Sequence, residues 1–367
     1  MKIDFANLQF QYKKYKKEID EKISNVLSSS KYIMGPEIFE LEEKLSSFTG
    51  ATFAVTCGSG TDALMLALKA VDVKEGDEII TTPFTFIATA EVISLLVAKP
   101  VFVDIDKKTY NIDTTKIKEK ITPKTKAIIA VSLYGQPCDL DELTQYTTNH
   151  YTNTPIYLII DGAQSFGAKY QGKSEVHFAD IFTTSFFPAK PFGCYGDGGA
   201  VFTNSKEIYE KIKSLRVHGQ TERYYHKYIG FNGRMDTLQA AVLLAKFPYY
   251  EHELELRRDV AARYDKNLRN SSKHVVLPFV ENDRTTVWAQ YSIRLSQRDE
   301  MSAKLKESGV PTAVHYPKPL HLQEAFNYLG YKEGDFPVAE AVSNEILSLP
   351  MNPFLTEDEI DYICDRI

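Results

Sequence analysis

Between about residue 50 and residue 215, the sequence alternates short apolar runs with stretches of helical pattern. Each apolar run is long enough for a buried strand, and helical stretches lie between several of them. This order is typical of strand–helix–strand units, which build a mostly parallel sheet with helices on both faces. The expected strands are residues 53–57, 78–82, 100–103, 126–131, 156–160, 181–185 and 200–203, and helices are expected at 61–71, 87–97 and 139–150.

The segments on either side of this alternation favour two domains. Pro36 at a first helical position and Gly50 at a C-cap position delimit one helix. Residues 233–270 have the pattern of one long helix or two, and the last stretch mixes short strands with helices at 298–308, 336–346 and 355–366. A chain of 367 residues is also longer than a single core usually supports. We therefore expect an α/β fold with a large, doubly wound domain over residues 1–245 and a smaller α+β domain over residues 246–367.

Composition and charge point to small-molecule partners. The net charge of −6 gives no overall attraction for nucleic acid, and no lysine–arginine run forms a basic stripe. The N-terminus lacks the apolar region of a secretion signal, and no apolar run approaches the roughly 18 residues that a bilayer span needs. The cysteines and histidines have no metal-ligand spacing, so we expect reduced thiols and no metal. These patterns predict a cytoplasmic protein without a membrane or nucleic-acid partner.

One lysine stands between an apolar strand and a loop rich in glycine. Lys190 lies in SFFPAKPFGCYGDGGA (residues 185–200), where aromatic residues and prolines flank it and glycines let the backbone approach a ligand. Burial in such a setting lowers the pKa of a lysine and frees the neutral amine, which attacks an aldehyde to form a Schiff base. On this segment alone, a glycine-rich surface turn is an equally good interpretation.

An acidic residue ends another strand-like run. Asp161 follows residues 156–160 and begins the segment DGAQSFGA (residues 161–168). In an open α/β sheet, the carboxyl ends of the strands form the edge where ligands bind, and pyridoxal phosphate (PLP) needs an acidic partner for its ring nitrogen. Asp161 fits that role, although an aspartate that merely starts a turn is about as common after a strand.

A third motif, CGSGTDALMLAL (residues 57–68), joins a strand end, a tight turn and an apolar helix. The free amides at the start of the helix and the hydroxyls of Ser59 and Thr61 point at one small volume, where the helix dipole favours a phosphate. The spacing is neither that of a nucleotide P-loop nor that of a dinucleotide-binding glycine motif. A helix N-cap without a ligand is the alternative interpretation.

Five motifs in a fixed order make the chain resemble a known enzyme family. They are GSGTDAL, PFTFIATA, DGAQSFGA, SFFPAKPFGCYGDGGA and FNGRMDTLQAA. Over nearly its whole length the chain resembles the sugar aminotransferases among the fold-type I PLP enzymes. The phrase SFFPAKPFGCYGDGGA is similar to that of enzymes that aminate C3 of a nucleotide-linked 3-oxo sugar, such as the UDP-2-acetamido-2-deoxy-3-oxo-glucuronate aminotransferases of surface polysaccharide (lipopolysaccharide, O-antigen) synthesis.

The resemblance implies a role for each matching residue on the cofactor side. Lys190 would be the catalytic amine and proton-transfer base, and Asp161 would pair with the ring nitrogen. The residues implied to hold the rest of PLP are Gly60, Thr61, Asp62 and Ser185 at the phosphate, Phe86 against the ring and Gln164 at the phenolic oxygen. Without the resemblance, a core position is the more common one for an aromatic such as Phe86.

The resemblance also implies a homodimer with shared active sites. In residues 231–234, the neighbouring chain would lend Asn232 to the phosphate and Arg234 to the site, where an arginine can clamp a substrate carboxylate with two hydrogen bonds. His315 and Tyr316 match a segment that faces the sugar nucleotide. From the residues alone, a turn with a solvated arginine is the more common structure at Arg234.

The motifs leave three functions open. The first is transfer of an amino group from an amino acid, glutamate in the family, to a keto sugar nucleotide, either a UDP-linked 2-acetamido-3-oxo uronate or a dTDP- or UDP-linked keto-deoxyhexose aminated at C3 or C4. The second is a PLP-dependent sugar dehydratase, and deoxygenating relatives have histidine at the position of Lys190. The third is a non-catalytic regulator on the same fold. The combination of Lys190, Asp161 and the phosphate turn favours amino transfer.

Overall fold

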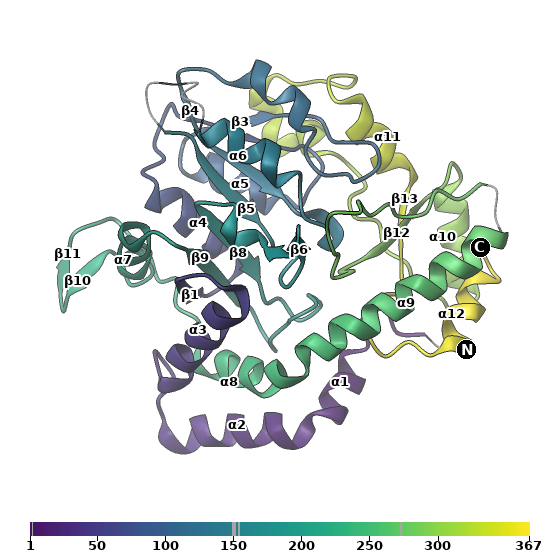
Figure 1. Cartoon of the computed structure of the whole chain (residues 1–367), viewed down its shortest axis with the longest axis horizontal. Helices are drawn as coiled ribbons and strands as arrows, with labels where there is room; N and C mark the ends of the chain where they lie inside the picture. Colours follow the sequence, from purple (N-terminus) through teal and green to yellow (C-terminus); the bar gives the residue numbers. More distant parts are fainter. Residues whose placement is uncertain (2, 149–151, 153–154, 272–273) are drawn as a thin grey trace.

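The computed structural model describes residues 1, 3–148, 152, 155–271 and 274–367. Its centre is a seven-stranded sheet with the order β1-β9-β8-β5-β4-β2-β3 (Figure 1). The strands are β1 (Phe53–Cys57), β2 (Glu78–Thr81), β3 (Lys99–Phe102), β4 (Thr125–Val131), β5 (Tyr157–Asp161), β8 (Ile181–Ser185) and β9 (Gly199–Thr203). Neighbouring strands are parallel except at β9, which pairs antiparallel with β1 and β8. The strand predictions are confirmed, and the predicted ends differ from the observed ones by at most one residue.

Side chains along each central strand alternate between two cores on opposite faces of the sheet. In β5, Leu158 and Ile160 enter one core and Ile159 enters the other. The first core packs under α3 (Pro36–Thr49), α6 (Leu140–Thr148) and α8 (Thr237–Lys246), and the second under α4 (Gly60–Ala70), α5 (Ala88–Leu95) and α7 (Lys206–Leu215). The doubly wound α/β prediction is therefore confirmed. Positions 149 and 150, at the end of the helix predicted for residues 139–150, lie outside the described residues.

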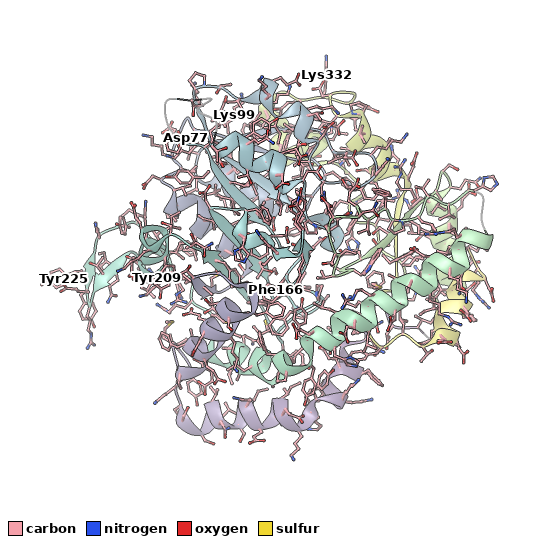
Figure 2. The ribbon with its side chains drawn as sticks, viewed as in Figure 1. Asp77, Lys99, Phe166, Tyr209, Tyr225 and Lys332 are labelled. Atoms are coloured by element: carbon pink, nitrogen blue, oxygen red, sulfur yellow. The ribbon has the colours of Figure 1, made fainter. Side chains whose placement is uncertain are left out.

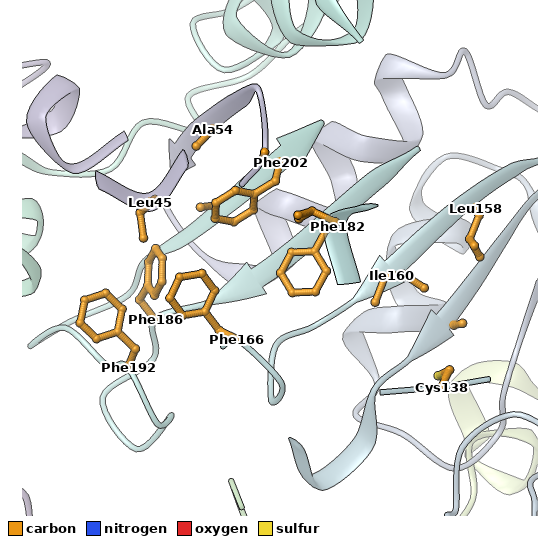
Figure 3. Packing of buried hydrophobic residues seen from close by; sticks show 14 of the residues in the cluster. Leu45, Ala54, Cys138, Leu158, Ile160, Phe166, Phe182, Phe186, Phe192 and Phe202 are labelled. Carbon is orange, nitrogen blue, oxygen red and sulfur yellow. The ribbon is translucent and has the colours of Figure 1, made fainter. Parts of the chain in front are cut away.

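Phenylalanine rings gather in the first core, beside the loop that follows β8 (Figure 3). Phe166 lies 5.8 Å from Phe192 and 5.9 Å from Phe186 between ring centroids, and Phe186 lies 5.6 Å from Phe192 edge to face. Such aromatic pairs add to the free energy of burial. Because Phe186 and Phe192 stand on either side of Lys190, this packing fixes the loop that carries the lysine.

A third core lies in the C-terminal part of the chain. There β12 (Tyr291–Arg294) and β13 (Ile346–Leu349) pair antiparallel and pack with α9 (Tyr250–Ser271), α10 (Arg298–Glu307) and α12 (Glu357–Cys364). Helix α9 spans two cores, because Tyr250 belongs to the first and Tyr264 to the third. Ile3 also enters the third core, so the N-terminal segment packs against the C-terminal part. The division of the chain at residue 245 stays a prediction.

The remaining elements lie around these cores. They are α1 (Leu8–Lys14), α2 (Lys16–Ser29), α11 (Pro337–Glu345), β6 (Lys169–Tyr170), β7 (Lys173–Ser174), β10 (Gln220–Glu222) and β11 (Tyr225–His226). The β10–β11 hairpin projects from the body (Figures 1 and 2), and Tyr225 on it is 70% exposed. Within the described part of the chain, no helix has the length and apolar character needed to cross a bilayer.

Candidate active site

The candidate site lies at the carboxyl ends of β5 and β8. Asp161 is the last residue of β5, Ser185 is the last residue of β8, and Lys190 follows in the next loop. Since β5 and β8 are adjacent and parallel, their ends meet at the same edge of the sheet, which is where open α/β sheets bind ligands. The topology thus brings the predicted amine and the predicted carboxylate together.

Asp161 is a buried carboxylate with two hydrogen-bond donors. Its Oδ2 accepts from Thr89 Oγ1 at 2.8 Å, and its Oδ1 accepts from the amide of Ala163 at 3.2 Å. Burial raises the pKa of Asp161, while these hydrogen bonds and the positive charge of Lys190 oppose that rise. Thr89 is itself 3.2 Å from Thr85, Oγ1 to Oγ1, so α5 presents an oriented hydroxyl to the carboxylate.

Lys190 sits in a tightly held loop. Its amide donates to the carbonyl of Phe187 at 2.8 Å, and the ammonium of Lys246, buried on α8, donates to the carbonyl of Gly193. Burial lowers the pKa of the Lys190 amine, and the nearby charge of Asp161 opposes the change. A lowered pKa increases the fraction of neutral amine, the form that attacks an aldehyde.

The side chain of Gln164 joins its own loop to the segments that contain Tyr134 and Tyr316. Its Oε1 accepts from the amide of Tyr134 at 2.6 Å, and its Nε2 donates to the hydroxyl of Tyr316 at 3.2 Å. The ring centroid of Phe86 lies 6.2 Å from that of Tyr316, and Phe86 is 56% exposed. Burial and the charge of Lys190 lower the pKa of His315 to about 4, which keeps that imidazole neutral near pH 7. The structure therefore groups these residues around one aromatic surface that remains open.

The predicted phosphate turn lies at the start of α4, next to β8. Ser59 caps the helix by accepting from the amide of Asp62 at 3.0 Å. A Cβ atom at Gly60 would lie 2.7 Å from Cβ of Ser185, so glycine permits the close approach of the two segments. Thr61 and its neighbours are half-buried. The start of α4 therefore lies against the end of β8, and its role as a phosphate site stays a prediction.

The segment with Asn232 and Arg234 lies beside the same turn. The amide of Gly58 donates to the carbonyl of Gly233 at 3.0 Å, and Asn232 is exposed. Nε of Arg234 is buried and has no hydrogen-bond acceptor among the described residues. His321, which the sequence did not connect with the site, is a buried histidine bonded to Glu340 at 2.9 Å.

Sequence reasoning missed two residues that contact the predicted site. Thr89 lies within PFTFIATA, but Thr85 precedes the helix, so no helical spacing in the sequence indicates the contact between the two hydroxyls. Tyr134 contacts Gln164 through its backbone amide, which no side-chain pattern reports. In the described ranges, no group of three or more histidine, cysteine and acidic side chains is arranged to hold a metal.

Comparison with known families identifies the family of the chain. Residues 13–367 match the DegT/DnrJ/EryC1/StrS aminotransferase family. The chain belongs to this family. The DegT family match extends over all five motifs and over every predicted site residue, so the resemblance that these motifs predicted is confirmed.

Individual relatives are similar in sequence to this DegT-family chain over almost their full length. UDP-2-acetamido-2-deoxy-3-oxo-D-glucuronate aminotransferase of Pseudomonas aeruginosa is 46% identical over 99% of this chain and 98% of its own. The pleiotropic regulatory protein of Geobacillus stearothermophilus is 44% identical over 100% and 98%. The crystal structure of S. venezuelae DesV in complex with a ketimine intermediate superposes with a TM-score of 0.95, at 34% identity over 100% and 97%.

The DegT-family aminotransferases use PLP, and the residues of this chain fit that cofactor. The buried Asp161 carboxylate suits a protonated ring nitrogen, the start of α4 suits a phosphate, and the exposed face of Phe86 suits a planar ring. Lys190 supplies an amine whose pKa is already lowered. These residues therefore fit PLP in charge, shape and chemistry.

Proposed function

We propose that this DegT-family aminotransferase moves an amino group from L-glutamate to C3 of a UDP-linked 2-acetamido-3-oxo uronate, with PLP as cofactor. The observation that carries the proposal is the meeting of the Lys190 amine with the buried Asp161 carboxylate at the ends of β5 and β8. The choice of sugar rests on the P. aeruginosa relative, which is 46% identical. That reaction would serve synthesis of a surface polysaccharide, such as the O-antigen of lipopolysaccharide, in the cytoplasm.

In this proposal each residue has one task. PLP supplies a ring that withdraws electrons from the substrate carbon. The Asp161 carboxylate, oriented by Thr89, holds the proton on the ring nitrogen. The Lys190 amine would hold the cofactor through its aldehyde group and would move the proton at the reacting carbon of the substrate. Phe86 packs on the ring, and Gln164 donates to its phenolic oxygen.

The remaining cofactor contacts hold the phosphate and the substrate. The amides of Gly60 and Thr61 and the hydroxyls of Thr61 and Ser185 would bind the phosphate at the positive end of α4, and the amide of Asp62, which caps the helix through Ser59, would add to the positive end. On the substrate side, we assign Arg234, whose buried Nε has no acceptor among the described residues, because a sugar carboxylate accepts two hydrogen bonds from a guanidinium. His315 and Tyr316 line the same side and remain neutral, which suits a sugar better than a second anion.

We further propose that the enzyme is a homodimer in which Asn232 and Arg234 enter the neighbouring site. Asn232 is exposed, and apolar side chains near the turn between α2 and α3 are also exposed, as a subunit contact requires. These side chains are Leu27, Tyr32, Ile33 and Phe39, which are 44–54% exposed. The hydrogen bond from Gly58 to Gly233 also holds the segment with Asn232 and Arg234 beside the phosphate turn of its own chain. A direct test must therefore decide which of the two sites these residues serve.

Mixed dimers of Lys190→Ala and Arg234→Ala chains provide that test. If Arg234 serves the neighbouring site, each heterodimer contains one intact site of two. Random exchange makes half of the dimers mixed, so activity should return to about a quarter of the wild-type value. Activity no greater than the sum of the two parents, with heterodimers verified by mass, would place Arg234 in its own chain or outside the site.

A panel of keto sugar nucleotides tests the reaction. The purified protein is incubated with glutamate and UDP- or dTDP-linked 3-oxo and 4-oxo sugars, and the new amine is located by NMR. We expect the highest kcat/KM with the 3-oxo uronate and nitrogen at C3. Amination of a deoxyhexose at C3 or C4 would make that sugar the substrate in place of the uronate. If no sugar is aminated, the second candidate function, a regulator, is favoured, as the name of the Geobacillus relative suggests.

A further inference from the structure

Glu175 is a buried carboxylate to which the proposed reaction gives no task. It is 1% exposed and stands in a short 3-10 turn, Glu175–His177, between β7 and β8. Its Oε1 accepts from Ser132 Oγ, and its Oε2 accepts from Ser165 Oγ at 2.6 Å. Both serines are fully buried. A buried carboxylate costs folding free energy unless its oxygens are hydrogen-bonded, so these two contacts are what make the position tolerable.

The two serines stand in two loops of the active site. Ser132 follows β4 and precedes Tyr134 by two positions, while Ser165 directly follows Gln164. The amide of Tyr134 donates to Gln164 Oε1 at 2.6 Å. The same two loops are therefore joined twice, once through the Tyr134–Gln164 contact at the site and once through the Glu175 carboxylate in the protein interior.

We propose that Glu175 is a positioning residue, whose carboxylate ties the loop after β4 to the loop after β5 and so sets the place of Gln164 at the cofactor. The amide of Ser132 also donates to the carbonyl of Asp161 at 3.1 Å, so the tie bears on the strand end that carries the predicted partner of the ring nitrogen. The inference rests on the proposed function, because Gln164 has a cofactor to position only in a PLP enzyme.

The surroundings of Glu175 make the tie sensitive to pH. Burial raises the pKa of Glu175 to about 7, and the hydrogen bonds from Ser132 and Ser165 and the charge of Arg284 oppose the rise. Cys138, near Ser132, stays neutral because burial raises the pKa of its thiol. When ionised, Glu175 accepts from both serines. When it is protonated, one oxygen carries a proton and a serine hydroxyl must turn to accept it, so the full tie forms as pH rises through about 7.

Glu175→Gln tests the tie in the PLP-loaded enzyme. The amide keeps the size of the side chain but offers a single acceptor oxygen. We expect kcat to fall about tenfold, since small displacements of positioned groups cost large factors in rate, while KM for glutamate changes less than about twofold. The wild-type rise of kcat through about pH 7 should disappear. Asp265→Asn is the control, because Asp265 also accepts from a hydroxyl, that of Tyr291, and burial also raises its pKa, yet it lies half-buried on α9, among residues of the C-terminal part.

Wild-type kcat and an unchanged pH profile in folded Glu175→Gln protein would overturn the inference. If that variant does not fold, Ser132→Ala and Ser165→Ala test the same tie singly and together. Because either substitution breaks the link between the two loops, the double variant should lose little more activity than the worse single variant. Losses of activity that multiply in the double variant would also overturn the inference. The wild-type protein could also aminate no sugar and yet show a change in cofactor absorbance with pH that is lost in Glu175→Gln. That result would support the positioning role of Glu175 and overturn the proposed function.

Discussion

Asp161→Asn should have opposite effects on the cofactor-free and the PLP-bound protein. Asp161 is 5% exposed, and burial raises the pKa of its carboxyl above the ordinary 3.8. The folded chain then holds this proton more tightly than the unfolded chain, so the free energy of unfolding falls as pH rises above 3.8. Asparagine carries no charge. We therefore expect the cofactor-free variant to be at least as stable as the wild type at neutral pH.

With PLP bound, the sign reverses. A hydrogen bond to a charged group contributes about 1.5–3 kcal/mol. Since 1.36 kcal/mol corresponds to a factor of ten, the variant should bind PLP on the order of 10- to 100-fold more weakly. Thr89→Val removes the donor at 2.8 Å but leaves the amide of Ala163, so it should show a smaller loss of the same kind.

The assay combines thermal unfolding, with and without PLP, and titration of the cofactor by its absorbance. Each variant is compared with the wild type over a pH series from near the ordinary 3.8 to neutral pH, because the buried carboxyl ionises above that ordinary value. The reasoning predicts a gain or no change without PLP and a loss with it. A variant that is less stable without PLP and yet binds PLP normally would show that Asp161 is a structural turn residue and not the partner of the ring.

Three further changes test separate parts of the account. Lys190→Ala should fold and bind PLP but form no amino sugar in repeated cycles, and steady turnover would mean that another residue is the base. Arg234→Lys should lower kcat/KM about tenfold more for a uronate than for a neutral sugar, because the planar fork is lost while the charge stays; equal losses would exclude a carboxylate clamp. Burial lowers the pKa of Lys246 from 10.5 to about 8, so the unfolded chain binds its proton more tightly and stability rises over that interval by roughly 3 kcal/mol at most. Denaturant unfolding of Lys246→Met should lack this rise, and an unchanged pH dependence would show that Lys246 is solvated.

Elements whose residues follow a strong local pattern could be predicted from the sequence. The strands were recognisable as buried apolar runs, and Gly50 ends α3 with a φ of 74°, a conformation that glycine adopts without strain. The antiparallel direction of β9 could not be predicted, because an apolar run does not indicate whether its strand pairs parallel or antiparallel with its neighbours. Helix α2 was missed since it buries only Ile19 and Val26, and it is held by packing on α8.

The candidate site divides in the same way. Asp161 and Ser185 were predictable because parallel strands bring their carboxyl ends to one edge, and their neighbours in the motifs carry recognisable chemistry. Tyr134 and Glu175 were not, because their contacts depend on loops that meet only in the folded chain. A single glutamate in a polar stretch reads as a surface residue, and only the two buried serines explain why it is inside.

The attachment point of PLP tests the central claim most directly. Borohydride reduces the bond between a lysine and the PLP aldehyde, which fixes the cofactor on the protein, and peptide mapping by mass spectrometry then identifies the lysine. The account predicts the added mass on the peptide that contains Lys190, and its loss in Lys190→Ala. An added mass on Lys246, which is buried and also has a lowered pKa, would contradict the account, as would amino transfer by protein that carries no label after reduction.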